Sequence, residues 1–578
     1  MKKGSRIIPF ILVVIALAAG ILFFKLQSNK TYRVEEVPEA ESNLDSWEIE
    51  TSQTNGLPIK EDKSIYEMEN NGKAETVYLT VFPTRDENGE TLTFGDFDFH
   101  LPRDKNFNPV LDANITFGDK AGLLPAQANA DVTNATIRVR GNSSRGAKYK
   151  SYKVKMKEDT QEFQNQTTLN LNKHVYDISK ITNKFCMDIM APIPDIASFR
   201  TNFMIVYIRD ASLPKEEQEF KYYGQYTHVE QPNKTYLRSR GLDVNGNLYK
   251  ANNFEFRMTE ELKNVDDPLY SEEAFETVLN IREGKDHTKV LKMIEDVNDV
   301  NKDFEETFST YFNEENYLTW MACNVLLGNE DTIAHNFIIY SPQDSTTWYL
   351  LPWDYDGTFK FGGYESSFLV PAEMRGVQRM TGVSLHRRYF RQPGSIDKLT
   401  QKMNELMNNY FTKEKVNSLL QSYLPVLEQT LVKEPDLSLG EIPPNEYKNY
   451  LNGFYDQIRA NYDGYMKSLD YPMPVFTNEP VKKSDGSLLF AWEPSYDFGN
   501  DLLKYNIKVA SDVDIRHVIF EQNGLTENSY VYKQGLSAGT YYMKVTISDT
   551  EGHTQYSLDY YEDPIKGMQF GIRQIIIP

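Results

Sequence analysis

The chain opens with an unbroken apolar segment. Residues 7–24 carry no charged side chain, and as a helix this run would measure about 27 Å, close to the hydrocarbon thickness of a bilayer. Three basic residues precede it, which favours a cytoplasmic N-terminus and export of everything that follows. The pattern predicts a transmembrane anchor in residues 1–28. A cleaved signal peptide is the alternative, with Ala16 to Ala18 as the cleavage site.

Alternating patterns follow a polar segment. Residues 29–72 are rich in Glu, Ser and Asn and predict a stalk. Beyond it, apolar and polar positions alternate with period two in several short runs, which predicts a β-rich lobe over about residues 73–250. A single helix is expected within this lobe at residues 178–189. The strands are predicted at residues 74–84, 135–139, 152–156, 202–208 and 221–229.

The spacing of apolar residues changes twice in the second half of the chain. Apolar positions recur at helical spacing in residues 266–320 and 385–469, which predicts an α-rich lobe over about residues 251–470. After Tyr471, short alternating runs separated by turn residues return, and they predict a separate all-β module over residues 475–578.

The last module has a recognisable pattern. Trp492, Tyr505 and the run from Leu536 to Val545 resemble the core tryptophan and late strand of a fibronectin type III domain. Such a domain serves as a spacer or as a binding surface, here with a wall, matrix or polysaccharide ligand as the possible partner.

Composition and charge exclude several classes of protein function. The 578 residues are 40% apolar, 25% charged and 13% aromatic, which is typical of large folded cores. The formal net charge of −21 argues against a nucleic-acid partner, so any site for a polyanion must be a local island of basic residues. Two cysteines are too few for a disulfide scaffold or a Cys-rich zinc site.

Such an island exists between Val132 and Lys157, where no acidic residue occurs. Its turn places Asn142, Ser143 and Ser144 between two predicted strands, and small residues let backbone N–H groups approach phosphate oxygens. The alternative is a solvated strand face. The island's basic residues are Arg138, Arg140, Arg145, Lys148, Lys150, Lys153, Lys155 and Lys157.

A second cluster follows an apolar helix predicted at residues 317–327. Asp331 and Asn336 stand five positions apart, just before a strand expected at residues 337–340. This is the offset in protein kinases between the Asp that accepts the substrate hydroxyl proton and the Asn that binds a divalent ion. Between them, His335 could be a catalytic or metal-binding residue, or a packing residue that orients the loop.

A third cluster, Asp354 and Asp356, follows a strand predicted at residues 348–351. Carboxylates on such a turn can bind the Mg²⁺ that bridges ATP phosphates. A calcium loop of the EF-hand type is the alternative, since Glu365 stands at the twelfth position from Asp354. The entering strand and the middle positions of the loop do not fit that alternative.

Taken in order, these segments resemble the CotH family of atypical protein kinases, named after spore coat protein H. The resemblance spans about residues 75–470. One departure is Thr182-Asn183-Lys184, where the family tends to carry Arg-Asn-Lys. The matching segments are RVRGNSS, KSYKVKM, YYGQYTHVEQPNKTYL, GNLYK, NEDTIAHNFIIY and LPWDYDGTF.

The resemblance implies an α+β, divergent two-lobed protein-kinase-like fold that uses ATP with Mg²⁺ or Mn²⁺ to phosphorylate protein Ser or Thr. It implies that Asp331 is the catalytic base and that Asn336, Asp354 and Asp356 bind the metal. For the cofactor it implies Lys153 on the phosphates, with Lys155 and Lys148 as alternatives, and Glu230 facing the nucleotide. The remaining candidates for cofactor binding are Arg140, Asn142, Ser143 and Ser144.

We therefore expect a phosphotransferase held in the cell membrane by one pass, with most of the chain outside the cytoplasm and a Ser- or Thr-containing protein as substrate. The alternative function is an inactive kinase-like surface protein that binds or supports other components through its fibronectin-like module. Retention of Asp331, Asn336 and Asp354 favours activity.

Overall fold

A computed structural model describes residues 56–577 apart from 69–70, 87, 101–106, 159, 161 and 360–371. The chain forms two units. Of the described residues, one unit comprises those within 56–359 and 382–463, and the other comprises those within 372–381 and 464–577. The domain boundaries expected from the sequence stay a prediction.

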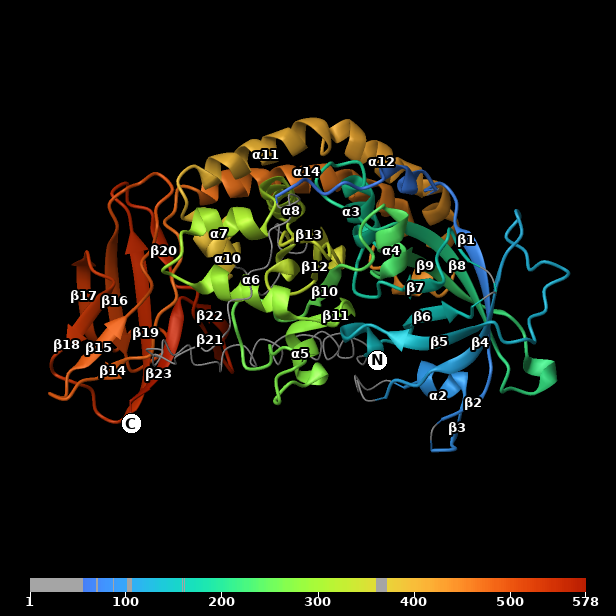
Figure 1. Cartoon of the computed structure of the whole chain (residues 1–578), viewed down its shortest axis with the longest axis horizontal. Helices are drawn as coiled ribbons and strands as arrows, with labels where there is room; N and C mark the ends of the chain where they lie inside the picture. Colours follow the sequence, from blue (N-terminus) through green and yellow to red (C-terminus); the bar gives the residue numbers. More distant parts are fainter. Residues whose placement is uncertain are drawn as a thin grey trace, which may run out of the picture. The chain divides into compact units, whose positions relative to one another are not determined.

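Seven strands of the larger unit close into a barrel (Figure 1). Neighbouring strands run antiparallel except at the seam, where β1 and β8 pair in parallel with Glu75 opposite Met204. In spatial order the strands are β1 (Glu75–Val81), β4 (Leu111–Phe117), β5 (Ala135–Arg140), β6 (Ser151–Met156), β7 (Thr168–Asn172), β9 (Lys221–Val229) and β8 (Thr201–Asp210).

The barrel core follows from the two-residue period of its strands. In β5, Ala135, Ile137 and Val139 are buried inside, so the intervening Arg138 and Arg140 lie on the outer face. In the same way, β6 buries Tyr152, Val154 and Met156 and turns its lysines outward. The predicted strands in the first half are confirmed, and their basic residues fall on the outside of the barrel.

A four-stranded sheet in the same unit has the order β11-β10-β12-β13. Its strands are β10 (Asn247–Ala251), β11 (Leu279–Glu283), β12 (Phe337–Ser341) and β13 (Tyr349–Pro352). A small hairpin pairs β2 (Thr84–Arg85) with β3 (Thr91–Leu92).

Helix α8 (Glu314–Leu327) shows how the helices place functional loops. The Asn313 side chain caps its start by accepting from the Asn316 N–H, and twelve consecutive residues from Asn316 onward are buried. It ends at Gly328, whose φ of 63° lies in the left-handed region and turns the chain into the loop that carries Asp331.

Among the other helices of this unit, α3 confirms the helix expected near residues 178–189. In Figure 1, α11 and α12 run above the two sheets. The α-helices are α2 (Phe94–Asp98), α3 (Thr182–Met190), α4 (Lys234–Ser239), α5 (Glu272–Val278), α6 (Thr288–Asn298), α7 (Phe304–Tyr311), α10 (Ser384–Phe390), α11 (Ser395–Asn409), α12 (Lys413–Thr430), α13 (Asp436–Leu439) and α14 (Pro444–Ser468), whose last turn falls in the other unit. The 3₁₀ turns are η1 (Lys63–Met68), η2 (Ser143–Gly146), η3 (Lys215–Glu217), η4 (Glu330–Thr332) and η5 (Tyr355–Gly357).

The smaller unit holds two sheets around a core that includes Trp492. One sheet has the order β14-β15-β18, and the other runs β17-β16-β19-β20 with β23 also on β19. This is the expected all-β module, while its assignment as fibronectin type III stays a prediction. Its elements are η6 (Ala372–Met374), α9 (Val377–Met380), β14 (Val481–Lys482), β15 (Leu488–Ala491), β16 (Lys504–Ala510), β17 (Val518–Leu525), β18 (Ser529–Tyr532), β19 (Gly539–Ser548), β20 (Thr554–Tyr556), β21 (Tyr560–Asp563), β22 (Gly567–Phe570) and β23 (Ile572–Ile577).

The predicted fold class needs two corrections. The β-rich first half is a closed barrel rather than the β lobe of a two-lobed kinase, because β1 returns to pair with β8. Within the described part of the chain, none of the helices combines the length and hydrophobicity that a membrane span needs. The anchor predicted in residues 1–28 lies outside the described residues.

Candidate functional site

Three strand ends bring the candidate residues to one edge of the four-stranded sheet. Strands β10, β12 and β13 are antiparallel neighbours, with Lys250 opposite Ile338 and Phe337 opposite Pro352. The end of β10, the start of β12 and the end of β13 therefore coincide. Asn336 precedes β12 and donates its backbone N–H to the Ala251 carbonyl at 3.2 Å.

The loop between α8 and β12 holds Asp331 with two neighbours. His335 Nε2 lies 2.8 Å from Asp331 Oδ1, and Asn336 Nδ2 donates to Asp331 Oδ2 at 2.6 Å. This use of the amide nitrogen leaves the Asn336 amide oxygen as an acceptor for a cation. The Asp331 side chain remains 43% exposed, so a substrate hydroxyl can reach it. His335 thus contacts the carboxylate, and its assignment as a catalytic or metal-binding residue or as a packing residue that orients the loop stays a prediction.

The turn after β13 lies directly against that loop. A Cβ on Gly357 would lie 3.2 Å from the Asp331 Cβ, so the two backbones approach closely. Asp354 itself has a φ of 60°, an uncommon conformation for a residue other than glycine. The turn is held from α3, where Asn183 Oδ1 accepts the Tyr355 N–H at 2.9 Å. Asn183 is a positioning residue that the sequence analysis did not identify.

The carboxylate of Asp354 is poorly compensated. Burial, together with the neighbouring Asp356, raises its pKa to about 6, although Lys250 and Arg140 act in the opposite direction. Asp356 has a buried neighbour in His174, whose Nδ1 lies 3.6 Å from Asp356 Oδ2. In the part of the chain that the structure describes, no hydrogen bond or ion pair reaches the Asp354 carboxylate.

This arrangement fits a hard divalent cation. Asp354, Asp356 and the Asn336 amide oxygen would hold it, and Mg²⁺ commonly binds through one or two carboxylates with substrate phosphates completing its shell. Among the described residues, no group of three or more His, Cys, Asp or Glu side chains is placed to bind a metal ion. Phosphate oxygens of a substrate would therefore have to complete the shell of the ion. The site therefore fits a metal that arrives with a phosphate ligand.

Positive charge from the barrel stands beside these carboxylates. Arg138 and Lys153 are direct cross-strand partners on β5 and β6, an arrangement of like charges that is unfavourable unless an anion lies between them. Burial, together with the nearby Arg138, Arg282 and Arg140, lowers the pKa of Lys153 to about 8. Burial also lowers the pKa of Arg140 to about 10, although Asp354 acts against this.

Some basic side chains of the turn after β5 make hydrogen bonds within the protein instead of facing a ligand. Two of its basic side chains serve the fold, since Arg145 donates to the Val139 carbonyl at 2.9 Å and Lys150 donates to the His100 carbonyl at 2.7 Å. Gly141 has a φ of 90°, and a Cβ there would collide with the Ser144 hydroxyl. Phosphate binding by Asn142, Ser143 and Ser144 stays a prediction.

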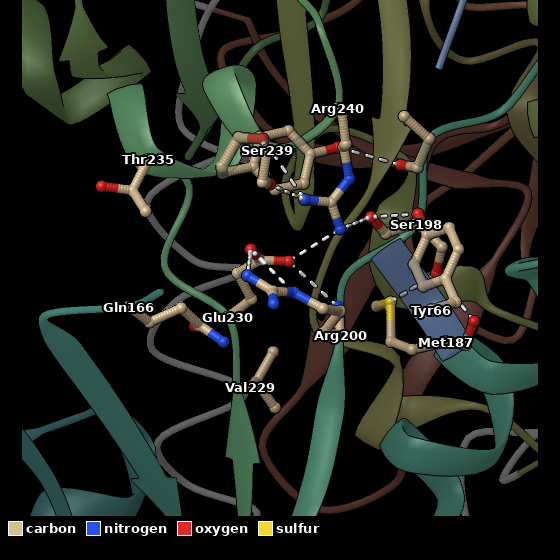
Figure 2. Close-up of polar contacts among 12 residues, drawn as sticks. Tyr66, Gln166, Met187, Ser198, Arg200, Val229, Glu230, Thr235, Ser239 and Arg240 are labelled. Carbon is tan, nitrogen blue, oxygen red and sulfur yellow. Dashed lines mark hydrogen bonds and ion pairs between the residues drawn. The ribbon is translucent and has the colours of Figure 1, made fainter. Parts of the chain in front are cut away.

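Glu230 belongs to a different group of side chains. Figure 2 shows it between two guanidinium groups, with Arg200 Nη2 at 2.6 Å and Arg240 Nη2 at 2.7 Å. Burial alone would raise its pKa, but Arg240 and Arg200 lower it to about 2. Its carboxylate is thus fully engaged within the protein, and the structure does not bring it together with Asp331 and Asp354. Its predicted role toward the nucleotide stays a prediction.

Two further cations at the site were missed. Lys250 lies at the end of β10 and Arg282 on β11, and both act electrostatically on the groups described above. Lys250 falls in the GNLYK segment, whose resemblance to the family was the one available signal. Arg282 has no comparable signal in the sequence.

Comparisons with known proteins include a curated relative and a solved structure. The chain is 22% identical to the inner spore coat protein H of Bacillus subtilis (strain 168) over 320 residues, which cover 54% of this chain and 83% of that protein. The crystal structure of the Helicobacter pylori proinflammatory kinase CtkA matches 60% of this chain and 95% of its own, with 9% identity and a TM-score of 0.23. A TM-score this low carries no argument about the fold.

The expected single-pass membrane location is corrected. It depended on residues 7–24, which lie outside the described residues, and the described helices include no membrane span. The relative from Bacillus subtilis is named as an inner spore coat protein. We therefore give up the membrane-anchored location.

Residues 137–462 match the family of CotH kinase proteins. The match includes both strands of the basic island, the Asp331 loop and the Asp354 turn, so it covers the whole candidate site. It extends over more than half of the chain, and this protein belongs to the CotH kinase family.

Proposed function

We propose that this protein transfers the γ-phosphate of ATP to a Ser or Thr hydroxyl of another protein, with Mg²⁺ or Mn²⁺ as the cofactor. One observation carries the proposal. An exposed carboxylate, an amide oxygen and the carboxylates of Asp354 and Asp356 meet at one sheet edge beside barrel cations, and within the described ranges no hydrogen bond or ion pair reaches Asp354. Membership of the CotH kinase family supports a kinase-like function independently of this geometry.

The step needs little covalent chemistry from the protein. The hydroxyl oxygen of the acceptor forms a bond to the γ-phosphorus, while the bond from that phosphorus to the β,γ-bridging oxygen breaks. ADP leaves with the electron pair of the broken bond, and the hydroxyl proton passes to the Asp331 carboxylate. A bound divalent ion supplies neutralising charge on the phosphate oxygens.

Each residue of the candidate site then has a defined role in the transfer. Asp331 orients the acceptor hydroxyl and takes its proton, and His335 and Asn336 hold that carboxylate through the two contacts given above. Lys153 and Arg140 bind phosphate oxygens and gain the counter-charge that the protein alone does not provide. The exposure of Asp331 suits a hydroxyl on a macromolecule, because such an acceptor cannot enter a closed cavity.

The test uses the full-length protein with γ-labelled ATP, a Ser-containing protein acceptor, and Mg²⁺ or Mn²⁺. Asp331→Asn should reduce transfer by about three orders of magnitude while ATP binding, measured by calorimetry, stays within about threefold. Asp354→Asn should abolish the metal-dependent part of ATP binding as well as transfer.

Asp397→Asn is the matched control, because Asp397 is an exposed residue in the first turn of α11. It should leave both measurements unchanged. Full transfer by Asp331→Asn would contradict the assigned base. A wild-type protein that binds neither ATP nor metal would favour the alternative, an inactive kinase-like binding module.

A further inference from the structure

The strand β10 turns one cation toward the site. Tyr249 is fully buried and packs against Phe275 and Trp348, so the next residue, Lys250, lies on the opposite face of the strand. Lys250 directly precedes Ala251, whose carbonyl accepts the N–H of Asn336. Its ammonium group interacts electrostatically with Asp354 and Asp331.

A second cation comes from an irregularity in β11. The pairing of β10 with β11 shifts register, since Leu248 faces Glu283 while Tyr249 faces Ile281. Arg282 is therefore the extra residue of a β-bulge, a feature that commonly re-aims a side chain near a functional site. Its Nε is buried and, within the described residues, has no hydrogen-bond partner. Arg282 acts electrostatically on Arg138, Arg140 and Lys153 across from it.

Other buried lysines of the same unit are fully compensated. Lys173 Nζ lies 2.8 Å from Asp436, Lys184 Nζ lies 2.9 Å from Asp188, and Lys150 donates to backbone carbonyls. Lys250 is partly buried, and in the described ranges of the chain its ammonium group makes no hydrogen bond or ion pair. A partly buried ammonium group that makes no hydrogen bond of its own is stabilised by an anionic ligand that arrives from outside the protein.

We propose that Lys250 and Arg282 form a second cationic wall that binds the polyphosphate of the nucleotide opposite the barrel residues Arg138, Arg140 and Lys153. Lys250 contacts the phosphoryl group that is transferred, because it lies on β10, the strand that pairs with β12 and holds Asn336. Arg282 binds the phosphates that remain with ADP, because it lies on β11, one strand farther from Asn336 than Lys250. The inference rests on the proposed function and adds two binding residues to it.

The first measurement needs neither metal nor turnover. Binding of inorganic tripolyphosphate to the full-length protein is followed by calorimetry without divalent ions. Lys250→Met and Arg282→Met should each weaken binding about tenfold, the effect of losing one charge-assisted hydrogen bond. Lys250→Arg keeps the charge and should stay within about threefold of wild type. Lys285→Met removes an exposed lysine two residues beyond β11 and should change nothing.

The second measurement separates the two residues by kinetics. Lys250→Met should lower kcat about 100-fold with little change in KM for ATP, because its contact strengthens as charge develops on the moving group. Arg282→Met should chiefly raise KM for ATP. The melting temperature of Lys250→Met should hold or rise, whereas loss of a merely structural lysine would lower it.

The outcomes distinguish this inference from the proposed function. Tripolyphosphate binding that both Met variants retain at wild-type strength would overturn the cationic wall, whatever the transfer activity. An unchanged kcat in Lys250→Met would overturn the placement of Lys250 at the transferred group. Binding that depends on both residues in a protein that transfers no phosphate would support the wall and contradict the proposed function.

Discussion

Two groups of buried charge in the same unit are built in opposite ways. Around Glu230, two guanidinium groups pair with one carboxylate, and Arg240 also pairs with Glu61 at 2.8 Å. Around Asp354, the second carboxylate Asp356 disfavours its charge, and Lys250 and Arg140 favour that charge without forming an ion pair to Asp354 among the described residues. The first group lowers the energy of the folded chain by itself, whereas the second remains costly until a ligand completes it. The comparison teaches which of two charged clusters is structural and which is functional.

The largest expected effect would break the first group. Glu230→Gln leaves Arg200 and Arg240 buried without their shared counter-charge, and it should lower the free energy of unfolding by about 3–5 kcal/mol. Denaturant unfolding monitored by circular dichroism measures this loss. A change under about 1 kcal/mol would show that the network does not hold the fold.

Acid should break the same group in the wild-type protein. The folded pKa of Glu230 is about 2 against an ordinary 4.5, so its stabilisation is complete above pH 4.5 and is lost as the pH falls through about 2. The shift corresponds to about 3 kcal/mol. The free energy of unfolding is measured against pH for the wild type and for Glu230→Gln, and the difference between the two curves isolates the contribution of Glu230. Two identical curves would rule this contribution out.

A smaller effect is expected where α3 supports the metal turn. Asn183→Ala removes the acceptor of the Tyr355 N–H and leaves that buried donor unsatisfied, which should cost about 1–3 kcal/mol. Because the turn carries Asp354, phosphate transfer should fall as well. Transfer at the wild-type rate together with the lost stability would show that Asn183 supports the fold without positioning the site.

The smallest effect has the opposite sign. Asp354→Asn replaces a desolvated carboxylate with a neutral group of the same shape, and it should raise the free energy of unfolding by about 1 kcal/mol in metal-free buffer. Added Mg²⁺ with ATP should stabilise only the wild type. A clear loss of stability in Asp354→Asn would place this carboxylate with the structural charges and remove the contrast between the two groups.

The sequence predicted those parts of this site that depend on the alternation of apolar and polar residues within one strand. The two-residue period of β5 and β6 places Arg138, Arg140 and Lys153 outward because their neighbours fill the barrel core. The residues at the edge of the small sheet were also found, because Asn336 and Asp354 each adjoin a short apolar strand.

Other features depend on contacts between distant residues. The pairing of β1 with β8 joins segments more than a hundred residues apart, and alternation within either strand does not reveal it. The bulge at Arg282 appears only when β11 is aligned with β10. Glu230 was assigned to the nucleotide from the family resemblance, and nothing near it in the sequence shows that Arg200, just before β8, would reach it.

The seam of the barrel also bears on how this protein is made. The chain through Asp210 must leave the ribosome before β1 can meet its parallel partner, so one side of β1 stays unpaired even after β4 has paired with the other side. Contacts of such long range slow folding, and an exposed strand edge can pair with another nascent chain. Overproduction of this protein should therefore be limited by misassembly at β1, and slower synthesis at low temperature should increase the soluble yield.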